Sequence, residues 1–226
     1  MKTVAVVTST TGRETLLKTI ESVQQQTYPC QHYIFYDGVP INMEFPKNIH
    51  VTQLPVKTGG GAIMNGAICA ASIFLTTEDY LCFVDDDNWF EPNHVESLMS
   101  IMRNNEYAYS LRRLINQDGT FWMNDDGEAT GHHGDLVDVN CFLMTRHLAK
   151  QVAPLWYNTN GEVMIGDRHV WAALLQNNVP YAASGKYTVN YRMASRWNTK
   201  PFFFLKNIQK RAQFPDGFPW SEAANG

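Results

Sequence analysis

The chain has 226 residues, of which 44% are hydrophobic and 18% are charged. This balance excludes a disordered chain, and the length suits one α/β domain with a sizeable core. The formal net charge of -4 provides no basic surface for nucleic acid, so we expect no nucleic-acid partner.

The first half of the chain alternates strands and helices. The expected elements are a strand at 3–8, a helix at 13–25, strands at 32–36 and 49–54, a helix at 62–75, a strand at 81–84 and a helix at 92–103. Apolar β-branched runs indicate the strands, and apolar residues at helical spacing indicate the helices. Thr11 with Glu14 matches a capping box at the start of the first helix. This order predicts a mostly parallel, Rossmann-like sheet flanked by helices.

The pattern changes after about residue 106. Expected here are strands at 107–114 and 120–123 joined by a hairpin, a strand at 137–145, and helices at 146–152 and 167–176. These runs favour a smaller antiparallel portion beside the parallel sheet. No internal repeat or linker interrupts the chain, so we expect one domain over residues 1–226.

Cysteine use and the apolar runs favour a cytoplasmic protein. The four cysteines are far apart, and Cys69 and Cys82 lie in apolar runs where buried free thiols are expected. No Asn-x-Ser/Thr glycosylation site and no signal-peptide pattern occur. The longest apolar stretch, residues 67–75, is far too short to span a membrane, so we expect no transmembrane segment.

Three consecutive carboxylates, Asp85, Asp86 and Asp87, follow the strand at 81–84. The carboxyl ends of strands are where open α/β sheets bind ligands. Clustered carboxylates repel one another and are costly to desolvate, and a cation would relieve both problems. Hard oxygen ligands suit Mg²⁺ or Mn²⁺, which complete their shells with substrate phosphates and water. The pattern therefore favours a divalent metal that holds a diphosphate; the alternative is an acidic turn that caps the helix after Pro92.

Polar residues also end the first two predicted strands. Thr8 and Thr10 end the first strand, and Arg13 opens the next helix, where backbone N–H groups favour anionic ligands. Alternatively, the threonines only cap that helix. Asp37 ends the second strand and can accept from a base N–H or a ribose hydroxyl, or can form an Asp-Gly turn with Gly38.

The remaining candidates have weaker patterns. The glycines at 59–61 allow a backbone to approach a ligand but lack Walker or dinucleotide spacing. Asp167 opens a helix, where it either complements the helix dipole or serves as a base across the cleft from the metal. Asp138 enters an apolar run, where a carboxylate needs a partner. His132 and His133 can ligate a metal, but their Gly-rich surroundings favour a solvated loop.

The ordered series of these motifs resembles the family 2 glycosyltransferases of GT-A fold over about the first 190 residues. The matching segments are 6–13, 16, 22–28, 36–38, 60–66, 83–88 and 166–167. The resemblance implies a transferase that moves one sugar from a UDP-sugar, or another NDP-sugar, to a hydroxyl of a glycan or glycoconjugate acceptor. It also implies Mn²⁺ or Mg²⁺ as cofactor, a nucleotide-binding half at about 1–105, and an acceptor-side half with the C-terminal tail at about 106–226.

The resemblance further implies roles for single residues. The implied nucleotide-binding residues are Thr8, Thr10, Arg13, Asp37, Gly60, Asn65, Asp85 and Asp86. Asp87 is implied as the main metal ligand, with help from Asp85, and Asp167 as the catalytic base of an inverting reaction.

Three positions depart from the family pattern. Met64 stands where many members carry Arg, and Gly166 replaces the first acid of the commoner Glu-Asp pair. The ending at 193–197 only partly matches the Gln-x-x-Arg-Trp of processive synthases, so a processive synthase is disfavoured. Two other functions stay open: a sugar-phosphate nucleotidyltransferase, which would release pyrophosphate, and a non-catalytic nucleotide- or sugar-binding module.

Overall fold

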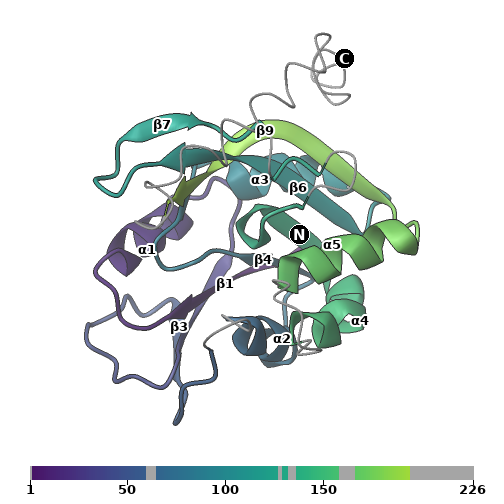
Figure 1. Cartoon of the computed structure of the whole chain (residues 1–226). Coiled ribbons are helices and arrows are strands. Elements are labelled where there is room, and N and C mark those ends of the chain that lie inside the picture. Colours follow the sequence, from purple (N-terminus) through teal and green to yellow (C-terminus); the bar gives the residue numbers. More distant parts are fainter. Residues whose placement is uncertain (1, 60–64, 127–128, 132–135, 158–165, 194–226) are drawn as a thin grey trace.

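A computed structural model of the chain describes residues 2–59, 65–126, 129–131, 136–157 and 166–193 (Figure 1). The strands are β1 (Val4–Thr10), β2 (Gln31–Tyr36), β3 (Ile49–Gln53), β4 (Tyr80–Phe83), β5 (Trp89–Phe90), β6 (Tyr107–Ile115), β7 (Phe121–Asn124), β8 (Phe142–Thr145) and β9 (Tyr181–Arg192). The helices are α1 (Leu16–Gln24), α2 (Gly66–Leu75), α3 (His94–Met102), α4 (Arg146–Trp156) and α5 (Gly166–Gln176), and Val139–Cys141 form a 3-10 turn.

The strands form one nine-stranded sheet in the order β3-β2-β1-β4-β8-β6-β9-β5, with β7 paired to β6. Strands β3, β2, β1 and β4 are mutually parallel. Strand β8 is antiparallel to both β4 and β6, and β9 then runs parallel to β6. The predicted α/β class is confirmed, with a parallel first half and an antiparallel junction to the second half.

The order of the parallel strands marks the carboxyl ends of β1 and β4 as the position where a ligand is expected. From β1 the chain passes through α1 to β2 on one side, and from β3 it passes through α2 to β4 on the other side. Right-handed crossovers in opposite directions put α1 and α2 on opposite faces of the sheet. The strand order therefore reverses between β1 and β4, and ligands of open α/β sheets bind beyond the carboxyl ends at such a point.

Aromatic side chains join the sheet to the helices α4 and α5. The ring of Phe142 lies 5.0 Å from that of Tyr107 and 5.8 Å from that of Trp156, measured between centroids. A Cβ on Gly166 would lie 3.0 Å from the Trp156 ring, so a glycine allows α5 to begin close to α4. This packing leaves little room for a side chain at position 166.

Some expected element boundaries were wrong. Helix α1 begins at Leu16 and has no side-chain cap, so the capping box is not formed. The strand expected at 137–145 begins only at Phe142, because a 3-10 turn precedes it. Asp138 caps that turn by accepting the N–H of Asn140 at 2.9 Å. Strands β5 and β9 were not predicted.

Two expectations from composition can be compared with the structure. All four cysteines are free thiols, and Cys69 and Cys82 are buried as expected. Within the described ranges, no helix combines the length and apolar character needed to cross a membrane.

Candidate functional site

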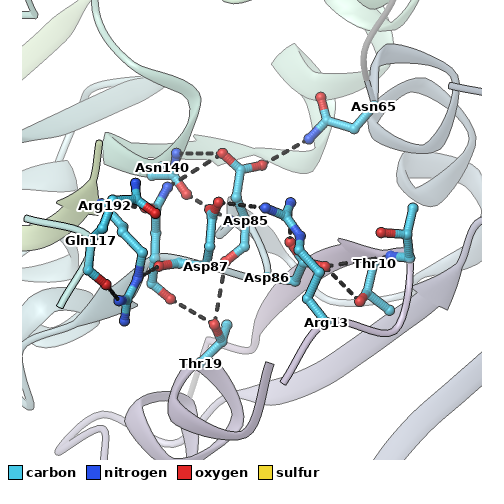
Figure 2. Close-up of polar contacts among 12 residues, drawn as sticks. Thr10, Arg13, Thr19, Asn65, Asp85, Asp86, Asp87, Gln117, Asn140 and Arg192 are labelled. Atoms are coloured by element: carbon cyan, nitrogen blue, oxygen red, sulfur yellow. Dashed lines mark hydrogen bonds and ion pairs between the residues drawn. The ribbon is translucent and has the colours of Figure 1, made fainter. Parts of the chain in front are cut away.

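The three consecutive carboxylates lie at the carboxyl end of β4, beside the end of β1 (Figure 2). The N–H of Val84 still bonds to the carbonyl of Val7 at 2.9 Å, and the chain then turns, with the N–H of Asn88 donating to the carbonyl of Asp85 at 3.1 Å. Because the backbone turns here, the three side chains point in different directions. Each carboxylate consequently has its own set of partners.

Asp86 is buried and links β4 to the connection between β1 and α1. Its Oδ2 accepts from Thr10 Oγ1 at 2.6 Å and from the Thr11 N–H at 3.4 Å. Its Oδ1 lies 2.5 Å from Arg13 Nη2. A buried carboxylate is unfavourable without such partners. Asp86 therefore fixes Thr10 and Arg13 at the carboxyl ends of β1 and β4, and only 1% of its own surface is exposed.

Arg13 also binds the next carboxylate, so it bridges two neighbouring acids. Its Nη1 lies 2.6 Å from Asp87 Oδ2, and about half of the arginine side chain stays exposed. Burial raises the pKa of Asp87, although the Arg13 charge opposes this shift. On the far side, Arg192 Nε donates to the Asp87 carbonyl at 3.3 Å, which fixes the turn.

Asp85 is held mainly by two asparagine side chains, and Asn88 Nδ2 adds a longer contact of 3.4 Å to its Oδ2. Its Oδ1 accepts from Asn65 Nδ2 at 2.9 Å, and its Oδ2 accepts from Asn140 Nδ2 at 2.9 Å. Burial raises the pKa of Asp85 to about 7, and the negative charge of Asp87 adds to this shift. The two amides carry no net charge, so they leave the negative charge of Asp85 without a direct counter-ion. A cation at this strand end would be stabilised by it.

Asp37 is buried and anchors the segment that leads to the glycine-rich region. It accepts from the N–H of Thr58 at 2.6 Å, from Thr58 Oγ1 at 2.8 Å and from the N–H of Gly59 at 2.9 Å. The next residue, Gly38, has a φ of +69°, and a Cβ there would lie 2.1 Å from the backbone nitrogen of Lys57. The Asp-Gly turn is therefore formed, and the carboxylate of Asp37 shapes the loop beside it.

Thr8 is the predicted site residue that lies apart from this cluster. Its side chain is fully buried, and its Oγ1 lies 2.9 Å from His32 Nε2 on the neighbouring strand. This contact joins β1 to β2. The expected positions Gly60, His132, His133 and Met64 lie outside the described residues.

Asp167 begins α5 and is nine-tenths buried or more, with 6% exposure. Its Oδ1 accepts the N–H of Arg168 at 2.8 Å. Burial raises the pKa of Asp167 to about 7, and the nearby charge of Asp138 adds to the shift. Burial raises the pKa of the Cys69 thiol, and the charges of Asp85 and Asp167 both add to this shift. A carboxyl that titrates near neutral pH can act as a general base.

Sequence reasoning missed two residues that support the acidic turn. The side chain of Asn140 accepts the backbone N–H of Asp85 and donates to the carboxylate of Asp85. Arg192 donates its backbone N–H to Asn88 Oδ1 at 2.8 Å and its Nη1 to the carbonyl of Gln117 at 2.6 Å. Only Asn140 carried a signal, because a polar residue within an apolar run must find partners.

The carboxylates at the end of β4 offer donor atoms of the kind that a divalent ion prefers. Within the described part of the chain, no three or more His, Cys, Asp or Glu side chains are grouped to hold a metal on their own. Mg²⁺ typically needs only one or two carboxylates when substrate phosphates and water complete its shell. Asp87, with 26% of its side chain exposed, and Asp85 offer hard oxygen donors, and both have a raised pKa. Their donor chemistry suits Mg²⁺ or Mn²⁺.

Comparison with solved structures places this fold among known ones. The structure of S. aureus TarS 1-349 in complex with UDP aligns with a TM-score of 0.63 and 12% sequence identity, over 86% of this chain and 61% of that one. The complex of the same protein with UDP-GlcNAc aligns with a TM-score of 0.62 and 13% identity, over 86% of this chain and 59% of that one. This chain thus spans about three-fifths of the TarS chains, and the likeness confirms the expected GT-A-type fold.

Comparison of sequences identifies the family. An uncharacterized protein of Haemophilus influenzae is 38% identical over 65 residues, which are 29% of this chain and 38% of that protein. The family model described as "Glycosyl transferase family 2" matches residues 3–151, about two-thirds of the chain. The match includes β1, β4 and all three carboxylates that end β4. The chain therefore belongs to glycosyl transferase family 2.

Proposed function

We propose that the chain transfers one sugar from a UDP-sugar to a hydroxyl of a glycan or glycoconjugate acceptor. The observation that carries this proposal is the acidic end of β4, bridged by Arg13, at the point where the strand order reverses. Family membership supports glycosyl transfer, and the uridine ligands named for the TarS structures support a uridine nucleotide as donor.

Donor binding is assigned to residues around the carboxyl ends of β1 and β4. Arg13 and Asn65 present donors toward the strand end and suit the nucleotide, with Asp85 as an acceptor. Thr10 and Asp86 act through Arg13, which they hold in place. The buried Asp37 shapes the loop that leads to Gly60, and Thr8 supports β1, so we assign these two side chains indirect roles in nucleotide binding.

The transfer is proposed to depend on a divalent ion, Mn²⁺ or Mg²⁺. Asp87 would be its main ligand, with help from Asp85. When bound, the ion would neutralise the charge of the departing diphosphate. The hard oxygen donors that Asp87 and Asp85 place at the end of one strand support this assignment, and burial raises the pKa of both carboxyls.

Asp167 is proposed as the catalytic base. It accepts the proton of the acceptor hydroxyl as that oxygen attacks the anomeric carbon from the face opposite the diphosphate. The bond from the anomeric carbon to the diphosphate breaks in the same step, so the anomeric configuration inverts. A pKa of about 7 leaves a substantial fraction of Asp167 ionised at neutral pH, which supports this role.

Donor binding and acceptor binding are proposed to be functions of different halves of one domain. Residues up to about 105 bind the donor nucleotide, and residues from about 106 onward face the acceptor. The junction through β8 supports this division, because its antiparallel pairing with β4 joins the second half of the chain to the strand that ends in the carboxylates. A cytoplasmic location stays a prediction.

The proposal is tested by incubating the purified chain with nucleoside diphosphate sugars and Mn²⁺. A thermal-shift screen selects the donor that stabilises the chain most. We then expect release of UDP and, with a suitable acceptor, a product of inverted anomeric configuration by NMR. Release of pyrophosphate would indicate a nucleotidyltransferase instead, and donor binding without turnover for any acceptor would indicate a binding module. Full turnover in excess EDTA would exclude the metal role.

A further inference from the structure

We propose that Asn140 is a positioning residue of the donor site, which fixes Asp85 in the orientation that the ion and the nucleotide require. The inference deepens the proposed function and rests on it. It assigns a role to a side chain from the second half of the chain, 55 residues beyond the carboxylate that it contacts.

The amide of Asn140 uses all its principal polar atoms on two acidic residues (Figure 2 shows the contacts with Asp85). Its Oδ1 accepts the backbone N–H of Asp85 at 2.7 Å. Its Nδ2 donates to Asp85 Oδ2 at 2.9 Å and to Asp138 Oδ1 at 2.7 Å. Asn140 is fully buried, so water does not compete for these bonds.

These partners specify an asparagine at this position. The backbone N–H of Asp85 requires an acceptor, and the two carboxylates require donors, which fixes the orientation of the amide. Aspartate would supply the acceptor but would place a third carboxylate between Asp85 and Asp138. Leucine has a similar volume but would remove one hydrogen bond from each of these three groups. Asparagine alone among residues of this size provides one acceptor and two donors in a plane.

Asn140 holds both the main chain and the side chain of Asp85. Oδ2 of this carboxylate is fixed by Asn140, and Oδ1 is fixed by Asn65. Hydrogen bonds at both oxygens define the plane of the carboxylate and prevent its rotation. A ligand that approaches the strand end therefore meets a preorganised oxygen donor, which need not be ordered on binding.

The other end of Asn140 is attached to a buried ion-pair cluster. Asp138 forms an ion pair with Arg112, whose Nε also lies 2.8 Å from Asp125 Oδ2. The guanidinium of Arg112 lies over the ring of Tyr191 at 4.3 Å. Because these charged side chains are all nine-tenths buried or more, the cluster is a rigid anchor. Asn140 thus holds Asp85 at a fixed position relative to the ion-pair cluster in the second half of the chain.

The experiment compares Asn140→Ala and Asn140→Ser with the matched control Asn190→Ala. Asn190 is a similarly buried asparagine, and its Nδ2 donates to Glu91 Oε1 at 2.9 Å, not to one of the three carboxylates that end β4. Calorimetric titration with UDP is carried out for each variant with Mn²⁺ and with EDTA. Loss of a partner that orients a metal ligand typically weakens metal binding by about 10-fold to 100-fold.

We expect Asn140→Ala to weaken Mn²⁺-dependent UDP binding by about 10-fold or more, and binding in EDTA far less. Serine keeps a hydroxyl that can donate and accept, so Asn140→Ser should lose less affinity. Asn190→Ala should lower the thermal midpoint yet bind UDP with Mn²⁺ as the wild type does. Exchange of the Asp85 amide proton, measured without metal or nucleotide, should accelerate in Asn140→Ala, because its acceptor is gone.

Wild-type affinity in both Asn140 variants would overturn the positioning role, and so would an equal loss in Asn190→Ala. If Asn140→Ala does not fold, Asn140→Ser decides, since wild-type affinity there contradicts the inference and a selective loss supports it. A wild-type chain that binds no UDP with Mn²⁺ would instead overturn the proposed function on which the inference rests.

Discussion

Replacement of Asp167 by asparagine is predicted to stabilise the protein while it abolishes sugar transfer. The side chain is buried at the start of α5, and its Oδ1 accepts the N–H of Arg168. Asparagine has the same shape and keeps this acceptor. It carries no charge, so it avoids the unfavourable burial of a carboxylate that the proposed base requires.

The magnitude follows from the pKa of Asp167, which burial and then Asp138 raise from 3.8 to about 7. Because the folded-state pKa is raised, the protonated carboxyl group does not destabilise the fold below the unfolded-state pKa of 3.8. The unfolding free energy then falls as the pH rises from 3.8 toward 7. At about 1.4 kcal/mol for each pH unit, the full loss is about 4 kcal/mol. We therefore expect Asp167→Asn to exceed the wild type by up to about 4 kcal/mol in unfolding free energy at pH 8, and by almost nothing near pH 4.

The assay is urea unfolding of both proteins at several pH values between 4 and 8, with transfer activity measured in parallel. Asp118→Asn is the control, because hydrogen bonds from Thr120 lower the pKa of this exposed carboxyl, and its amide variant should not be more stable at pH 8. Loss of a general base typically reduces the rate by about 100-fold to 10,000-fold. The reasoning is refuted if Asp167→Asn gains no stability at pH 8, if the gain is the same at pH 4, or if full transfer activity remains.

Three further substitutions test the packing around the site. Burial lowers the pKa of His94 to about 3, so the folded state loses stability as the pH falls below 6.5 and unfolded His94 takes up a proton. In His94→Gln, the unfolding free energy measured in urea should fall by about 2 kcal/mol less between pH 7 and pH 5 than in the wild type. An unchanged pH dependence would contradict this. Gly38→Ala should lower the thermal midpoint of unfolding far more than Gly119→Ala. Both glycines have a positive φ, but of the two only Gly38 has backbone atoms within 4 Å of the added Cβ. Equal shifts of the midpoint would show that φ alone matters. Thr10→Val should reduce the unfolding free energy by about 2 kcal/mol, because the buried carboxylate of Asp86 loses its hydroxyl donor. Thr11→Val should have little effect. Similar losses in both variants would argue against the contact between Thr10 and Asp86.

The parallel half of the sheet could be predicted because its signals are local. Strand β1 begins with the apolar run Val4–Val7, β4 is apolar throughout, and almost every residue in the two strands is buried. Runs of this kind point to strands that are covered on both faces. The position of the carboxylates at the end of β4 followed directly, because a strand that ends in acids delivers them to the sheet edge.

Strand β9 could not be predicted because its pattern is interrupted. It pairs in parallel with β6, but the register shifts between Tyr109 and Leu111, where Ala183 and Tyr187 are the respective partners. The residues skipped by this shift include Gly185, which has a φ of +65°. A bulge of this kind breaks the alternation that marks a strand, and the stretch then resembles a loop.

The individual contacts of the site were beyond sequence reasoning for a different physical reason. Asp37 was expected to face a nucleotide, yet in the structure it accepts three hydrogen bonds from Thr58 and Gly59, 21 and 22 residues away. Asn140 reaches Asp85 across 55 residues. Such contacts depend on how strands are placed side by side, and residue spacing along the chain does not contain that information.

The central claim is that the acidic end of β4 holds a divalent ion that in turn binds a uridine diphosphate. Its most direct test is the affinity of the wild-type chain for UDP, measured by titration calorimetry with Mn²⁺ and with EDTA, beside Asp87→Ala. We expect binding that is strong with Mn²⁺, much weaker with EDTA, and equally weak in Asp87→Ala under both conditions. The same affinity in all four titrations would contradict the claim.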